Sequence, residues 1–408
     1  MTSAANLLQL LNGNNHLPTN NNMKRLISIL FVLITLHSFA QVTDSSRTWH
    51  VGIFASLYLD SSFDGSNYKF DKQMPKHILS GLDFVEGSLM AFDSLGKQVK
   101  LSVKVFDLRS ASQSISKLKT QNSFDSLDMM IGAVVGAEYR QLADLAFQKN
   151  IPFISATFPN DGGVTNNPYT IITNSTLPVH CQAIYNYVLR NFATANIIYL
   201  RKKGQQEDRL ASYFESSNKG AAGSSLLKWK TITTDSVAPG AFQSSLDSEK
   251  VNIIIAGSLD ERFATQLINS SKPFIKKYSL QLMGMPTWET LKDITKSEWK
   301  DIPICYSTTF YNSGFGKWAY FTKTFTDKTN GRPSDLAFKG FDLTYVFTQL
   351  LFKYGTELNK NLTDKSFKWF LDYDFRPVLN KTSGKPDYYE NKRIFILKRT
   401  NGLISKMN

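Results

Sequence analysis

Residues 127–161 constrain the fold more than any other segment, because they follow the order strand, helix, strand within a short span. The apolar run 129–135 predicts a buried strand, and the spacing of apolar residues over 138–149 predicts a helix. Asn150 stands where a left-handed helix cap belongs, directly before the apolar residues 151–154. The segment is therefore typical of a β–α–β unit with two parallel strands.

Two loops of this unit are candidates for a binding site. In an open parallel sheet, ligands bind beyond the carboxyl ends of the strands. The loop 135–137 and the Ser/Thr loop 155–158 both follow predicted strands, so we expect them to lie side by side at one edge of the sheet. The segment thus predicts a cleft for a small molecule.

The segment 23–40 is typical of a secretory signal peptide. Two basic residues precede the apolar run 26–36, and Ser38 and Ala40 occupy the −3 and −1 positions of a cleavage site. A membrane anchor is the alternative, but the apolar run is too short to span a bilayer. We expect residues 1–40 to comprise an upstream extension and the signal peptide, and the start codon, Met1 or Met23, stays open. Because residue 41 is Gln and not Cys, we expect a soluble periplasmic product with no lipid anchor.

The charge distribution bears on the class of partner. The formal net charge is +13, and loss of the signal peptide lowers it to +11. Basic residues are scattered between apolar segments, whereas nucleic-acid binding needs a clustered basic stripe or a known motif. We therefore expect no nucleic-acid partner and a solvated basic surface, which would suit an anionic ligand or a membrane surface.

The sequence offers little support for catalysis or metal binding. Cys181 and Cys305 are the only cysteines, so we expect two buried thiols, with a single bridge as the alternative. His50 and His180 lack metal-ligand spacing, and no nucleophile-elbow, Walker A, dinucleotide or zinc motif appears. We expect no enzyme activity, no cofactor and no metal. Acids far apart in sequence can still meet in a cleft, so an exported hydrolase is an alternative.

A second alternating series follows the first. Strand patterns at 196–200, 251–256 and 280–283 alternate with helical patterns at 207–214 and 262–269. The 368 residues after Ala40 suffice for two domains, and no low-complexity linker divides them. The expected fold class is α/β, with two similar Rossmann-like lobes built on parallel sheets.

Four pieces of the sequence carry a resemblance to a known family. They are the first helix with Gly81 and Gly87, the run 131–155, the segment 196–201, and the residues 337–342 in a late helix. Their order resembles the type I periplasmic binding protein fold, in particular the branched-chain-amino-acid-type substrate-binding proteins of ABC transporters. The resemblance covers nearly the whole chain after residue 49.

The resemblance implies a division of the chain into lobes. In that family the chain crosses between lobes three times, and the crossings would fall here near Thr173, near Ile302 and after Leu358. Lobe 1 would comprise residues 41–172 and 303–358, and lobe 2 residues 173–302 and 359–408. The crossings would form a hinge.

The sequence departs from the family at two loops. Members that bind amino acids usually carry a serine in the loop after the third strand, where this chain has Val135, Gly136 and Ala137. They often carry Tyr-Gly early in the second lobe, where this chain has residues 201–204, Arg-Lys-Lys-Gly. The substrate class therefore stays open.

For a zwitterionic ligand, the two loops of the first lobe would supply N–H groups and hydroxyls to a carboxylate. An acid of the second lobe, Asp260 or Glu289, would hold an ammonium, and Tyr58 and Trp288 would cover the ligand from opposite lobes. The predicted ligand-binding residues are Tyr58, Gly136, Ala137, Ser155, Ala156, Thr157, Asp260, Trp288 and Glu289.

Each of these residues also has a structural interpretation. Ser155 and Thr157 are typical of turn caps, Glu289 of a helix's first turn, and Trp288 of a core. We expect a monomeric periplasmic protein that closes its lobes on a small polar ligand, such as an amino acid, and delivers it to an ABC permease. The alternative is a sensing or cell-envelope module of the same fold without a permease, motivated by the aromatic segment 306–325.

Overall fold

The computed structural model describes residues 47–70, 74–96, 100–220, 223–238, 240–291, 294 and 297–408. The predicted upstream extension and signal peptide lie outside these residues. None of the helices in the described ranges is long and apolar enough to cross a membrane.

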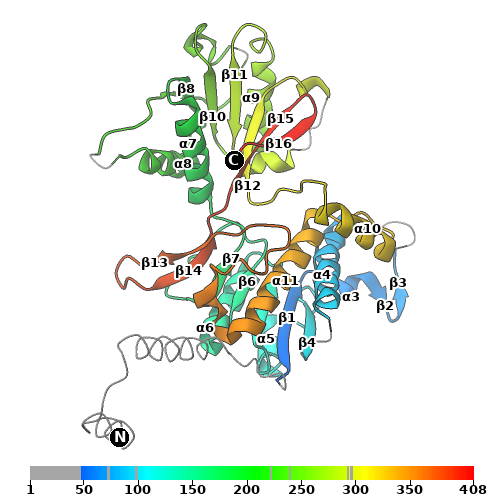
Figure 1. Cartoon of the computed structure of the whole chain (residues 1–408). Coiled ribbons are helices and arrows are strands. Elements are labelled where there is room, and N and C mark those ends of the chain that lie inside the picture. Colours follow the sequence, from blue (N-terminus) through cyan, green and yellow to red (C-terminus); the bar gives the residue numbers. More distant parts are fainter. Residues whose placement is uncertain are drawn as a thin grey trace, which may run out of the picture. The chain divides into compact units, whose positions relative to one another are not determined.

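The first sheet has the strand order β13-β14-β7-β6-β5-β1-β4 (Figure 1). Its strands are β1 (Trp49–Ala55), β4 (Leu101–Asp107), β5 (Met129–Gly132), β6 (Phe153–Ser155), β7 (Thr170–Ile172), β13 (Phe375–Leu379) and β14 (Pro386–Asn391). All neighbours pair in parallel except the hairpin of β13 and β14.

Helices cover both faces of this sheet because side chains alternate along each strand. Ile53 of β1 packs with α4 (Lys76–Leu95) and α11 (Asp335–Tyr354). Its neighbour Phe54 packs on the other side with α5 (Ile115–Thr120) and α6 (Ala137–Lys149). The apolar strands are thus buried on both faces, as in other parallel sheets.

The second sheet has the order β16-β15-β12-β11-β10-β8-β9. Its strands are β8 (Asn196–Arg201), β9 (Lys230–Thr233), β10 (Asn252–Gly257), β11 (Leu280–Gly284), β12 (Ile304–Thr308), β15 (Phe395–Thr400) and β16 (Leu403–Lys406). Helices α7 (Leu177–Phe192) and α8 (Gln205–Ser217) cover one face, and α9 (Glu261–Ser271) covers the other. The predicted α/β fold with two parallel-dominated sheets is confirmed.

The remaining elements are short, except α10, which buries Trp318, Phe321 and Phe325. They are α3 (Leu59–Ser62), β2 (Phe63–Asp64), β3 (Asn67–Tyr68), η1 (Gln243–Ser245), η2 (Pro286–Thr290), η3 (Ser297–Trp299), α10 (Lys317–Thr329) and η4 (Gly355–Asn361).

The β–α–β unit predicted over residues 127–161 is confirmed. It consists of β5, α6 and β6, and the two strands pair in parallel with Gly132 opposite Ser155. Asn150 ends α6 in the left-handed region, at φ 54°, as its place in the sequence predicted.

Three segments cross between the two sheets, at residues 173–176, 309–316 and 392–394. The first matches the predicted crossing near Thr173, whereas the other two differ from the predicted division of the chain. Within 303–358, assigned to lobe 1, β12 pairs with β11 in the second sheet. Within 359–408, assigned to lobe 2, the hairpin of β13 and β14 extends the first sheet. An apolar run of five residues predicts a buried strand but does not specify which of two sheets it joins.

Two glycines from the resemblance have a packing reason. Helices α4 and α11 lie against each other (Figure 1). A Cβ on Gly87 would lie 2.0 Å from the carbonyl oxygen of Ala337, and a Cβ on Gly340 would lie 2.1 Å from that of Phe84. Only glycine permits this approach, so the pair fixes the crossing of the two helices.

Candidate functional site

A cavity of about 870 Å³ is lined by residues attached to both sheets. The first lobe contributes the loop 159–163 after β6, and the second contributes α8 and η2. Residues 174–178 and His180, at the first crossing and the start of α7, also line it, as do Leu259, Thr308, Thr309 and Tyr388. The cavity thus lies beside the crossings, where a change in the lobes' separation would alter it.

The first-lobe wall is held by hydrogen bonds within that lobe. The N–H of Gly163 and the hydroxyl of Tyr388 donate to the two carboxylate oxygens of Asp161, at 2.9 and 3.1 Å. Tyr139 donates to the main-chain oxygen of Asp161 at 3.2 Å. Gly162 has φ 57°, and a Cβ there would lie 2.7 Å from the ring of Tyr139. The wall is therefore preorganised, with a carboxylate in it.

The crossings are hydrogen-bonded to one another. Thr309 of the second crossing donates to the side-chain oxygen of Asn174 in the first, at 3.0 Å. Ser175 of the first crossing donates to the main-chain oxygen of Asn391, next to the third. These bonds join the segments that any hinge motion must bend.

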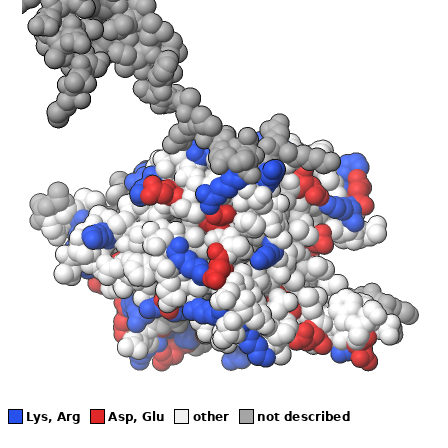
Figure 2. All heavy atoms as spheres, turned by 90° about the horizontal axis from the view of Figure 1, so that it is seen from below, with Lys and Arg blue, Asp and Glu red and all other residues white. Residues whose placement is uncertain are grey.

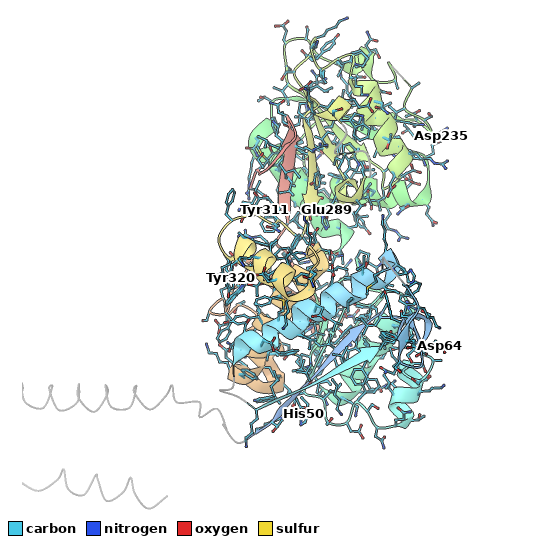
Figure 3. All side chains as sticks on the ribbon, turned by 90° about the vertical axis from the view of Figure 1, so that its right-hand side faces the viewer. His50, Asp64, Asp235, Glu289, Tyr311 and Tyr320 are labelled. Carbon is cyan, nitrogen blue, oxygen red and sulfur yellow. The ribbon has the colours of Figure 1, made fainter. Side chains whose placement is uncertain are left out.

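Glu289 of η2 is the acid that the second lobe places in the cavity (Figure 3). Thr308 at the end of β12 donates to its Oε1 at 2.8 Å. The side chain is accessible from the cavity, and the protein around it, by excluding water, raises the pKa of the Glu289 carboxyl. The Thr308 hydrogen bond and the nearby Lys339 oppose that shift, whereas Asp335 adds to it.

His180 of α7 also lines the cavity. Only 4% of its surface is exposed, and its Nδ1 lies 3.0 Å from the hydroxyl oxygen of Ser307. Burial lowers the pKa of His180 to about 4, and the charge of Lys339 acts in the same direction. The imidazole is therefore neutral at pH 7.

Of the nine predicted ligand-binding residues, Glu289 is the one that lines this cavity. Tyr58 precedes α3 at φ 56°, with its ring edge-on to His77 at 4.8 Å between centroids. Gly136 and Ala137 are exposed where α6 begins. Tyr58, Gly136 and Ala137 therefore do not line the cavity.

Three more predicted residues lie at the end of β6 and directly after it. Ser155 and Ala156 have no exposed surface, and Thr157 donates its hydroxyl to the main-chain oxygen of Val134 at 3.1 Å. Thr157 is thus engaged in its own lobe, as the capping interpretation has it.

The last two predicted residues lie in the second lobe. Asp260 caps α9 by accepting the N–H of Phe263 at 2.8 Å and pairs with Lys202 at 2.8 Å, which lowers the pKa of its carboxyl. Trp288 is fully buried, and a Cβ on Gly284 would lie 2.0 Å from its ring.

Sequence reasoning did not select Asp161 or His180 as ligand contacts. A signal for Asp161 was present, because Asn-Asp-Gly-Gly at 160–163 is typical of a tight loop after a strand. His180 carried no such signal, since a single histidine in a helix is compatible with many environments.

The fold resembles that of several solved substrate-binding proteins. A proposed branched-chain amino acid ABC transporter protein from Rhodospirillum rubrum has a TM-score of 0.66 and 11% identity, covering 88% of this chain and all of that one. A branched-chain amino acid ABC transporter periplasmic ligand-binding protein from Burkholderia xenovorans has 0.57 and 13%, covering 88% and 94%. An ABC transporter substrate-binding protein from Desulfitobacterium hafniense, in complex with Leu, has 0.55 and 12%, covering 88% and all of that chain.

At these identities the likeness concerns the fold alone. The two-lobed type I periplasmic binding fold expected from the sequence is confirmed. No protein-family model matches the chain, and no curated protein sequence matches it significantly.

Proposed function

We propose that this protein is a periplasmic solute-binding protein that captures a small polar ligand between its lobes and delivers it to an ABC permease. The observation that carries the proposal is the cavity of about 870 Å³, lined from both lobes beside the three crossings. A ligand there contacts both lobes at once, so it binds the closed form more tightly than the open form. Only that difference in affinity shifts the population toward closure.

Two further observations support transport. The segment 23–40 is typical of a secretory signal peptide, which would bring a monomeric mature protein to the periplasm. The solved structures of similar fold include substrate-binding proteins of ABC transporters, one of them in complex with Leu. An amino acid or a related compound is therefore the first ligand class to test.

The test is small-angle scattering of the protein lacking residues 1–40. We expect the radius of gyration to fall when a pool of amino acids or amines is added, and to return after dialysis. If pools of amino acids, amines, carboxylic acids and sugars all leave the scattering unchanged, the proposal is wrong.

A second candidate function is ligand sensing with a cell-envelope partner and no permease. It is favoured by two exposed aromatic side chains. Phe315, directly before the N-cap of α10, is 81% exposed, and Tyr320 in the first turn of α10 is 68% exposed. Figure 3 labels Tyr320. Large exposed aromatics are typical of contact sites. Uptake of labelled ligand by cells decides between the two: loss of uptake without the protein supports transport, and unchanged uptake supports sensing.

A further inference from the structure

The charge of the cavity differs from that of the whole chain. The sequence carries a net charge of +13, and Figure 2 shows basic and acidic side chains interspersed on one face. In the cavity, Asp161 of the first lobe faces the space together with Glu289 of the second. The basic lining residues are His180, which is neutral, and Arg209, which is exposed on α8. The interior therefore has a more acidic balance than the chain as a whole.

Glu289 retains capacity to bind a cation. Its Oε1 accepts from Thr308, whereas no hydrogen bond to its Oε2 is present among the described residues. Lys339 is the nearby base, and its charge is also felt by Asp335. One lysine does not neutralise two carboxylates, so Glu289 is not fully compensated by it.

Three N–H groups beside the cavity are already engaged and are not free for a ligand carboxylate. In the loop 159–163, the N–H of Gly162 donates to the side chain of Asn160 at 2.7 Å, and that of Gly163 to Asp161 at 2.9 Å. At the start of α7, the N–H of Thr176 donates to Glu390 at 2.7 Å. The loops predicted to bind a carboxylate, at 135–137 and 155–157, do not line the cavity.

The rest of the wall suits an apolar body. Leu177, Pro178, Leu259 and Pro286 present aliphatic surface, and Tyr213 adds an aromatic ring. A volume of about 870 Å³ exceeds what a small amino acid needs and accommodates a larger chain or ring.

We propose that the captured solute is an organic amine, whose ammonium group is held by Glu289 and which requires no carboxylate. This inference rests on the proposed solute capture and specifies its substrate class. Asp161 faces the amine from the other lobe, so the charge of a single cation draws both lobes together.

Two matched sets of probes test the substrate class by titration calorimetry at low salt. The first set is isoamylamine, leucine and 4-methylpentanoate, and the second is phenethylamine, phenylalanine and 3-phenylpropanoate. Within a set the apolar body is constant and only the charged groups change. We expect at least one amine to bind as tightly as its amino acid or more tightly, and neither carboxylate to bind.

Two variants connect the result to Glu289. Glu289→Gln keeps the shape and removes the charge, so it should weaken amine binding roughly tenfold or more. Glu298→Gln removes an exposed acid of the same lobe, paired with Lys272 outside the cavity, and should leave binding within about twofold.

The outcomes separate this inference from the proposed function. If a carboxylate binds as well as its amine, if Glu289→Gln leaves amine affinity unchanged, or if neither amine binds, the substrate class is wrong. Compaction by a non-amine pool in the scattering experiment would then leave solute capture standing. If no pool compacts the protein and no probe binds, both ideas fail.

Discussion

The predicted binding loops differ from the cavity beside the crossings in how their charged groups are paired. At the loops, charged groups pair within one lobe: Arg109 with Glu138 at 3.0 Å in the first lobe, and Lys202 with Asp260 at 2.8 Å in the second. In the cavity, Asp161 and Glu289 come from opposite lobes and face a common space. Charges already neutralised by an ion pair in their own lobe gain little from closure. Asp161 accepts only from neutral donors, Gly163 and Tyr388, so its charge and that of Glu289 can still gain from a shared cation. The difference favours the cavity as the place where ligand and closure are coupled.

The largest expected effect comes from filling one of these two regions. Thr287→Trp introduces a large ring into the cavity wall and should weaken ligand binding by about a hundredfold or more, because the ligand loses its space. Ala137→Trp introduces the same ring at an exposed position of the predicted loops and should leave binding unchanged. Calorimetry with the best-bound amine measures both, and thermal unfolding checks that both variants fold. If Ala137→Trp blocks binding and Thr287→Trp does not, the ligand binds at the loops.

The sequence predicted the fold better than the site, for a physical reason. The β–α–β unit at 127–161 depends on local patterns, which are apolar periodicity and a left-handed cap at Asn150. The cavity depends on which sheet each late strand joins, and that choice is made by pairing between residues far apart. Because β12 joins the second sheet, Thr308 is placed beside Glu289, and because β14 joins the first, Tyr388 is placed beside Asp161.

The individual site residues show the same limit. Glu289 was selected because an acid after a strand can face a ligand, and that reasoning applied equally to Asp260. Their environments differ in ways that the sequence does not display. Asp260 is occupied by Phe263 and Lys202, whereas Glu289 has a single donor, Thr308, among the described residues.

The second-largest effect is a loss of folding stability at low pH, caused by His180 in the cavity wall. The pKa of His180 is lowered from 6.5 to about 4 in the folded state, so the unfolded chain binds the proton more tightly. Stability from the neutral imidazole is fully present above pH 6.5 and is lost as the pH falls toward 4. Relative to His180→Gln, which does not titrate, the wild-type free energy of unfolding should fall by about 2 kcal/mol between pH 7.5 and pH 5.

Urea unfolding of both proteins at several pH values measures this difference. Subtracting the value for the variant from that for the wild type removes the contribution of other titrating groups. One such group is Asp342, whose pKa is raised by burial to about 6 and which stabilises the protein as the pH falls. A difference that does not change with pH would show that His180 titrates normally and that the wall is open to water.

The smallest change, in the free energy of unfolding, is expected from substitutions of Asp260. This residue tests whether the predicted loops, rather than the cavity, bind the ammonium. Asp260→Ala removes both the helix cap and the partner of Lys202, and should lower the free energy of unfolding by about 1 kcal/mol. Asp260→Ser keeps a capping oxygen and should cost about half of that or less, because an exposed ion pair contributes little. Neither variant should change amine affinity by more than about twofold, since the carboxylate is occupied within its own lobe. A loss of amine affinity in both variants, comparable to that of Glu289→Gln, would place the ammonium at Asp260 and make the loops of the second lobe part of the binding site.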